Sequence, residues 1–164
     1  MQKILTTFLI LSLTSLPSKS FGADQEEFYL GGLLCLTGDC AEVGDNSRKG
    51  IELATEEING SGGILGKKLA LKFEDTKEMG GPGSVISAFQ NLVLDPKIRY
   101  IIGPTWTVGG LPLAPILAKK PEVIAISPSL GVATYNEASD TVFNTWPHDD
   151  ASTEALAKYA FKKG

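Results

Sequence analysis

The fold of this chain is decided by one stretch, residues 68–103, which reads KLALKFEDTKEMGGPGSVISAFQNLVLDPKIRYIIG. Its first eight residues place apolar side chains at every second position, which is typical of a β-strand. Residues 84–94 space apolar side chains three and four apart, as a helix does when one face is packed. The apolar run 98–103 reads as another strand. A strand, a helix and a strand in this order predict a βαβ unit with two parallel strands.

The same alternation extends outward in both directions from this unit. We expect further strands at 28–35, 122–126 and 141–145, and further helices at 45–59, 111–119 and 151–163. Pro112 and Pro115 are expected to confine the start of the helix at 111–119. The resulting order, βαβαβαβ followed by a loop and then βα, predicts an α/β fold. In such a fold a parallel sheet carries helices on both faces, as in Rossmann and flavodoxin-like proteins.

Composition and single residues exclude several classes of protein. The chain has 164 residues, 43% hydrophobic and 21% charged, with a net charge of -4, so we expect one soluble domain. An acidic chain without a basic cluster is not expected to bind nucleic acid. One histidine, His148, and two cysteines make a four-ligand zinc site improbable, and we expect no metal or cofactor. His148 is interpreted as an exposed residue beside a helix cap, although a general base is conceivable.

Catalytic motifs are missing from the sequence as well. It contains no Gly-x-Ser-x-Gly nucleophile elbow and no phosphate-binding loop of the Gly-x-x-x-x-Gly-Lys-Ser/Thr type. The glycine-rich segment 60–66 follows a helix and precedes a strand, which is the reverse of a dinucleotide-binding fingerprint. We therefore predict that the chain is not an enzyme.

The N-terminus has the pattern of an export signal. Lys3 precedes an apolar run at 4–16, Pro17 ends the run, and small residues follow at Ser20 and Gly22. This pattern predicts a signal peptide over residues 1–22 and a mature domain over 23–164. The alternative is an uncleaved membrane anchor, but a run of about 13 residues is short against the roughly 20 that span a bilayer. Export predicts a periplasmic protein without stable membrane insertion.

Cys35 and Cys40 enclose four residues and would face an oxidising compartment after export. A disulfide between them and a pair of free thiols remain open alternatives. The sequence cannot decide, because a disulfide requires a particular separation of the two Cα atoms.

Ligands of parallel α/β sheets bind beyond the carboxyl ends of the strands. That rule selects three loops, at 36–44, 104–110 and 128–140. In the second loop, Thr105, Trp106 and Thr107 lie where a strand ends and a helix begins. Backbone N–H groups at a helix start can hold a carboxylate, and an adjacent tryptophan can form an apolar wall. The alternative is that both threonines cap the helix and that Trp106 belongs to the core.

Several short motifs resemble one known family. They comprise LTGD (36–39), KGIELA (49–54), GGILGK (62–67), EDT (74–76), AFQNLV (88–93), IIGP (101–104), ISPS (126–129) and FNTWP (143–147). In this order and spacing the chain resembles the type I periplasmic binding proteins, the leucine/isoleucine/valine-type solute-binding proteins of ABC transporters. The resemblance implies a lobe that helps to capture an amino acid or similar small polar solute for delivery to ABC permease subunits. It also implies that Thr105, Trp106, Thr107, Ser129 and Gly131 form this lobe's part of the ligand site.

The sequence departs from the family pattern at several positions. Gly131 stands where family members often have a threonine, Val43 where many have an aromatic residue, and Trp106 where a smaller residue is common. These departures leave the identity of the ligand open. The second lobe of the family is absent, so the chain is expected to be a truncated reading of a longer gene or a fragment with one lobe. The alternative function is the sensory lobe of a receptor or regulator with the same fold.

Overall fold

The computed structural model describes residues 26–164 and contains a five-stranded, fully parallel sheet. The strands are β1 (Glu27–Leu34), β2 (Lys68–Asp75), β3 (Tyr100–Ile102), β4 (Ile124–Ser127) and β5 (Val142–Asn144). The helices are α1 (Ala41–Gly60), η1 (Glu78–Gly80), α2 (Pro82–Val93), α3 (Thr107–Leu117), α4 (Ala133–Asn136) and α5 (Asp149–Lys163). The spatial order β2-β1-β3-β4-β5 places the first strand inside the sheet. The predicted α/β class and the alternation of elements are therefore confirmed.

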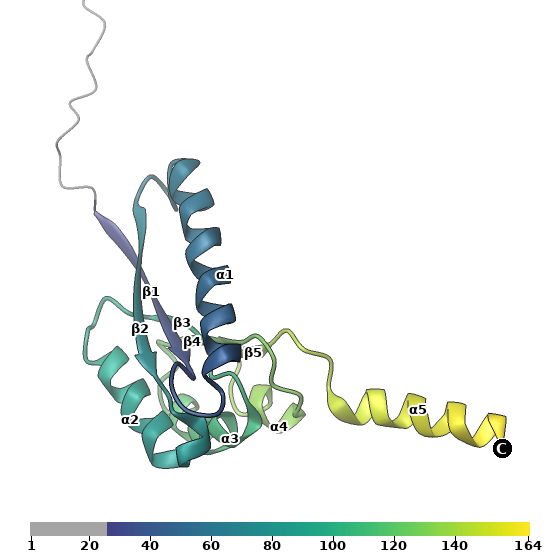
Figure 1. Ribbon diagram of the computed structural model, residues 1–164. Helices are drawn as coiled ribbons and strands as arrows, with labels where there is room; N and C mark the ends of the chain where they lie inside the picture. The colour runs from purple at the N-terminus through teal and green to yellow at the C-terminus, as the bar shows by residue number, and fades with distance from the viewer. Residues whose placement is uncertain (1–25) are drawn as a thin grey trace, which may run out of the picture.

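Helices cover both faces of the sheet, but unequally. Figure 1 shows α1 on one face and α2, α3 and α4 on the other. The hydrophobic core lies on the side of α2 and α3, where Phe89, Leu92 and Leu113 pack against Leu33 and Ile101 of the sheet. The apolar spacing in 84–94 therefore marks the helix face that closes the core.

Helix α1 begins at Ala41, four residues earlier than the pattern predicted. Gly44 misled the prediction, because a glycine in a polar segment was interpreted as part of a turn. In the structure a Cβ on Gly44 would lie 1.7 Å from the carbonyl oxygen of Cys35. The glycine is thus required by the close approach of the helix to the end of β1, and the loop after β1 is shorter than expected.

Helix α3 also begins earlier than predicted, at Thr107, and it contains both Pro112 and Pro115. The prolines had been expected to confine the helix start. Two glycines in its first turn suit the early start, because a Cβ on Gly109 would lie within 3.1 Å of Glu78 and one on Gly110 would overlap the Leu130 side chain. Tertiary packing has overridden the local cost of proline within this helix.

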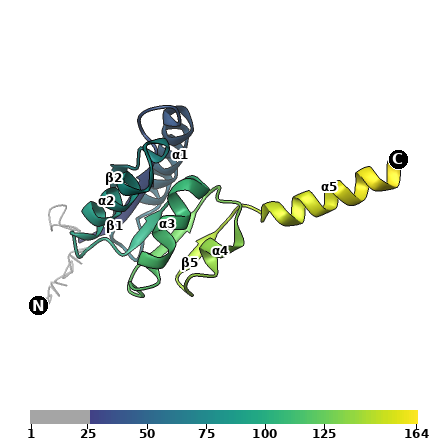
Figure 2. The ribbon, with the colours of Figure 1, turned by 90° about the horizontal axis from the view of Figure 1, so that it is seen from below.

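Helix α5 lies apart from the rest of the structure. None of its residues is buried, and Figures 1 and 2 show it projecting away from the sheet. Its charges still match the helix dipole, with Asp149 and Asp150 in the first turn and Lys162 and Lys163 in the last. Across residues 26–164, we find no helix that is both long and apolar enough to cross a membrane. The predicted signal peptide, 1–22, lies outside the described residues.

Candidate functional site

The three loops selected from the sequence follow β1, β3 and β4, at one end of the parallel sheet. The first loop is held on two sides. Cys35 and Cys40 form a disulfide with their Cα atoms 5.8 Å apart. The carboxylate of Asp75, at the end of β2, accepts hydrogen bonds from the Leu36 N–H and the Thr37 hydroxyl. Burial opposes ionisation of Asp75, but these hydrogen bonds outweigh it and lower the pKa of the carboxyl group.

The second loop carries three residues that were predicted to contact a ligand. Thr105 is buried, and its hydroxyl finds no hydrogen-bond partner among the described residues. Trp106 is half-buried and extended, and it is the residue directly before α3. Thr107 is the first residue of α3 and is also half-buried. Thr105 therefore lies beneath the surface of the loop, whereas Trp106 and Thr107 reach that surface.

An internal carboxylate occupies the amides of this loop. Glu78, in η1, is fully buried, and its two oxygens accept the N–H groups of Thr105 and Trp106 at 2.8 Å each. The hydroxyl of Thr76 also donates to Glu78, at 3.2 Å. Burial raises the pKa of Glu78, and the two backbone hydrogen bonds offset part of that rise. The loop therefore does bind an anion, but that anion belongs to the protein.

The carbonyl groups of the same loop are held by the neighbouring strand end. The hydroxyl of Ser127 donates to the carbonyl of Pro104 at 2.8 Å, and that of Ser129 donates to the carbonyl of Thr105 at 2.6 Å. Ser129 was predicted as a ligand contact, and in this structure its hydroxyl joins the second loop to the third. Hydrogen bonds thus join the segments that follow β3 and β4.

Thr107 is left as the donor group of the site. The first N–H groups of a helix have no acceptor within the helix, and the amide and hydroxyl of Thr107 have no partner among the described residues. The positive end of the α3 dipole adds to their pull on an anion. This arrangement can accept one carboxylate of a ligand at Thr107, beside the indole of Trp106.

An acidic residue that was not predicted from the sequence lies against the third loop. A Cβ on Gly131 would lie 2.2 Å from a carboxylate oxygen of Asp149, the first residue of α5. The N–H of Asp149 also donates to the carbonyl of Gly131 at 2.8 Å. The missing side chain at position 131 therefore makes room for a carboxylate, and the site gains a group that attracts a cation.

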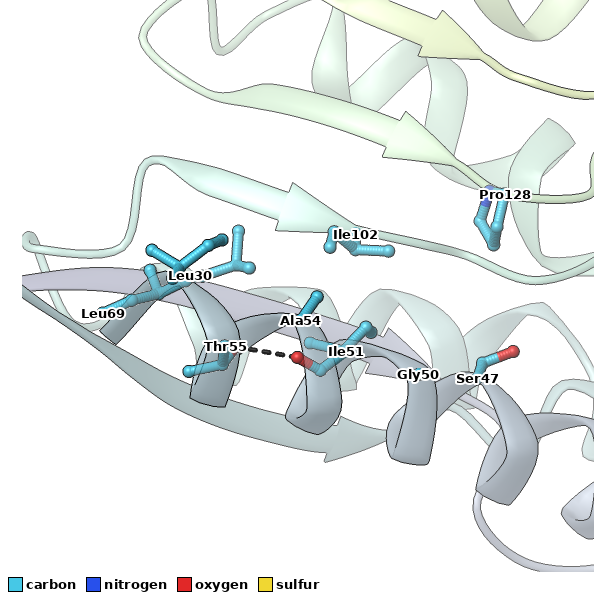
Figure 3. A pocket seen from close by; sticks show the side chains of 10 residues that line it. Leu30, Ser47, Gly50, Ile51, Ala54, Thr55, Leu69, Ile102 and Pro128 are labelled. Carbon is cyan, nitrogen blue, oxygen red and sulfur yellow. Dashed lines mark hydrogen bonds between the residues drawn. The ribbon is translucent and has the colours of Figure 1, made fainter. Parts of the chain in front are cut away.

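A separate apolar groove lies on the α1 face of the sheet. Figure 3 shows Ile51 and Ala54 of α1 opposite Leu30 and Ile102, with Pro128 at one end. Its lining is almost entirely apolar, and it carries no charged side chain among the residues that line it. The groove therefore lacks the polar groups of the loop site and is distinct from it.

Sequence reasoning selected Trp106 and Thr107 because a strand end followed by a helix start is visible in the sequence, and the structure places both at the start of α3. It missed Glu78 and Asp149, which come from η1 and α5. Their only local signal was an acidic residue near a glycine-rich turn and one at a helix start. Within residues 26–164, no group of three His, Cys, Asp or Glu side chains is arranged to hold a metal.

Comparison with known proteins gives a consistent assignment. The family described as "Periplasmic binding protein" matches residues 27–164. The Leu/Ile/Val-binding protein BraC3 of Rhizobium johnstonii is 32% identical over 161 residues, 98% of this chain and 41% of BraC3.

Two solved structures have the same fold. A Desulfitobacterium hafniense ABC transporter substrate-binding protein in complex with Leu has a TM-score of 0.72 and 26% identity, over 85% of this chain and 40% of that one. The branched-chain amino acid transporter substrate-binding protein LivJ of Streptococcus pneumoniae, in complex with isoleucine, has a TM-score of 0.68 and 27% identity, over 76% and 35%.

The chain spans about two fifths of the length of these relatives. The family is one of binding proteins rather than enzymes. The fold, the motifs and the family match agree over nearly all of the described residues. This chain belongs to the periplasmic binding protein family.

Proposed function

We propose that this chain is the N-terminal lobe, residues 23–164, of a solute-binding protein that captures an amino acid or a similar small polar solute for an ABC importer. The proposal is carried by two polar groups that have no side-chain partner among the described residues and follow strand ends at the same edge of the sheet, one a donor set and the other an acceptor. The donors are the amide and hydroxyl of Thr107, and the acceptor is the carboxylate of Asp149.

The two groups match the two charges of an amino acid. A ligand carboxylate at Thr107 gains hydrogen bonds from a helix start, and such charge-assisted bonds are the stronger kind. A ligand ammonium near Gly131 would meet the Asp149 carboxylate in place of the hydroxyl that a threonine would offer there. The relatives whose structures contain leucine or isoleucine support this class of ligand.

Trp106 would contribute the wall against which the ligand's side chain packs. An indole is larger than the residue common at this position in the family, so the space left for that side chain is smaller or differently shaped. We therefore propose the class of ligand, a free amino acid or a close analogue, without choosing a side chain. The family and the apolar N-terminal run with its small residues support a periplasmic location, with 1–22 as the signal peptide.

The experiment is a titration of this chain with L-leucine, followed by amide NMR. We expect the Thr107 amide to shift, with the weak affinity of a single lobe. Thr107→Ala should weaken binding roughly ten- to a hundred-fold, because hydrogen bonds to charged groups contribute about 1.5–3 kcal/mol. Thr141→Ala, at the far end of β5 from the site, is the matched control and should bind as the parent does. Equal binding by both variants would remove Thr107 from the site.

The ligand class has its own test. Asp149→Asn should weaken L-leucine and leave a carboxylic acid without an ammonium group, such as 4-methylpentanoate, unaffected. If both ligands lose affinity equally, Asp149 does not recognise the ammonium group.

A further inference from the structure

Glu78 is the buried charge that the proposed function does not use. It lies in η1, a three-residue helix between β2 and α2, yet the two backbone amides that donate to it are 27 and 28 residues further along the chain. No lysine or arginine forms an ion pair with it among the described residues. Among these residues, its carboxylate accepts hydrogen bonds from two backbone amides and one hydroxyl group.

A buried carboxylate of this kind lowers the stability of the fold when it is ionised. Burial raises the pKa of Glu78, so the folded chain holds a proton there more tightly than the unfolded chain does. Stability from this group is present at low pH and is lost as the pH rises above the usual range for glutamate. The ionised form of this carboxylate therefore works against folding. Buried groups of this kind concentrate at functional sites.

The surroundings of Glu78 are shaped to keep it in place. Gly109 leaves its side chain room, since a Cβ there would lie 3.1 Å from the Glu78 carboxyl carbon. Tyr135, whose hydroxyl donates to the Gly103 carbonyl at 3.3 Å, is the titratable neighbour. Burial raises the pKa of Tyr135, and the charge of Glu78 raises it further, so the two groups share one buried region.

The polar groups of residues 104–106 are thus nearly all directed inward. Glu78 takes the Thr105 and Trp106 amides, while Ser127 and Ser129 take the carbonyls of Pro104 and Thr105. The next amide, that of Thr107, is the first without an acceptor among the described residues. Glu78 occupies the amides of Thr105 and Trp106, so the Thr107 amide is the first in this segment that can donate to a ligand.

We propose that Glu78 is a positioning residue of the ligand loop: its carboxylate acts as a built-in anion that fixes residues 104–106 and so presents the amide and hydroxyl of Thr107 to the ligand. The inference rests on the proposed function for the identity of the site. It goes beyond it in naming the residue that preorganises the site, and preorganisation increases affinity by removing the cost of ordering the loop.

The first experiment needs no variant and no ligand. The amide resonances of Thr105 and Trp106 are followed by NMR as the pH is lowered from 8. Both should move together with one midpoint, above the usual range for glutamate, because both donate to the same carboxylate. Amides that do not move, or that move with separate midpoints, overturn the assignment.

The second experiment compares two variants by amide hydrogen exchange. In Glu78→Gln the side-chain NH₂ faces a backbone donor, so at least one of the Thr105 and Trp106 amides should exchange ten-fold faster or more. The Thr107 amide resonance should move as well. Thr76→Val removes the neighbouring hydroxyl and keeps both amide bonds, so it should leave all three amides as in the parent. Unchanged amides in Glu78→Gln, with the β1 core amides still protected, would overturn the proposal.

Failure of the proposed function would be recognised separately. If L-leucine shifts no amide of the parent chain while the Glu78 results hold, the ligand assignment fails and the positioning role stands. If L-leucine binds the parent and Glu78→Gln equally well, the positioning role fails and the ligand assignment stands.

Discussion

The two faces of the sheet are closed by different means. On the α2 and α3 face, fifteen buried residues form one continuous hydrophobic cluster, with Phe89 and Tyr135 as its largest members. On the other face, only Gly44 and Thr55 of the twenty residues in α1 are buried. Buried apolar area holds the α2 and α3 face together, whereas α1 buries too few residues to be held in the same way.

Helix α1 is held mainly at its two ends, by directional links. At its C-terminal end, the Asn59 side chain accepts the Leu69 N–H at 2.7 Å and donates to the Leu69 carbonyl at 2.9 Å. Its N-terminal end is tied by the Cys35–Cys40 disulfide and by Asp75. Between these links lies the apolar groove of Figure 3.

A row of apolar side chains continues from that groove across the sheet. Ile102 pairs in register with Ile126, and Ile126 with Phe143, so the three share the α1 face. Ile126 is 39% exposed and Phe143 is 48% exposed. The loop proposed to bind the ligand therefore lies on the same side of the sheet as the hydrophobic core, since Glu78, Gly109 and Tyr135 all pack on the α3 side.

The largest expected effect compares one aromatic residue on each face. Phe89→Ala should lower the free energy of unfolding by about 3–5 kcal/mol, because it opens a cavity in a closed core. Phe143→Ala should cost less than about 1 kcal/mol, because the ring is already half in water. Urea denaturation followed by circular dichroism measures both. Similar losses in the two variants would contradict the contrast between the faces.

The second effect concerns the N-terminal link of α1. Replacing both Cys35 and Cys40 by serine should lower stability by about 2 kcal/mol, the chain-entropy value for a small closed loop. The measurement is the denaturation midpoint of the double variant beside that of the oxidised parent. A reducing agent should bring the parent close to the variant and leave the variant unchanged. No difference under any of these conditions would show that the link adds nothing.

The third effect concerns the C-terminal link. Asn59→Ala should cost about 1–2 kcal/mol, because it removes two hydrogen bonds and leaves the Leu69 N–H without its partner. Asn91→Ala is the matched control, since Asn91 is exposed on α2, and it should change stability by less than about 0.5 kcal/mol. If Asn59→Ala loosens α1, hydrogen exchange should rise in α1 and remain low in α2. Exchange that rises equally in both helices would mean that the link is not local.

The smallest effect depends on pH. The lowered pKa of Asp75 means that its contribution to stability is present above the usual aspartate range and is lost as the pH falls through the folded value. Asp75→Asn should therefore be less stable than the parent at pH 7, by about 1 kcal/mol, from weakened hydrogen bonds to a charged acceptor. The gap should close as the pH falls below the usual aspartate range. A gap that stays constant with pH would show that the carboxylate's charge is not what holds Leu36 and Thr37.

Much of the fold was predictable because its signals are local. The strand at 68–75 was predicted at its observed bounds, and each predicted helix overlaps an observed one. The helix starts at Ala41 and Thr107 were placed too late, because glycines inside a helix look like turn residues until their neighbours are known. Gly44 and Gly109 are there for close approach to Cys35 and Glu78, which no local pattern records.

The position of the loop after β3 at the sheet edge was predictable, but its hydrogen bonding was not. A strand end before a helix start marks Thr107, since the rule for parallel sheets depends only on the order of elements. The rule does not say which amides of the loop are already taken. That required the position of Glu78, whose two acceptors meet amides 27 and 28 residues away.

The sequence by itself determined the α/β class and the parallel sheet, and it selected loops at one edge of that sheet as candidates for ligand binding. It could do so because alternation and helical spacing are set by neighbours a few residues apart. Only the tertiary structure decided that Glu78 lies beneath the loop after β3, that Asp149 fills the space beside Gly131, and that none of the residues of α5 is buried. These facts depend on how loops and helices stack at the sheet edge, where the free energy comes from contacts between residues far apart in the chain.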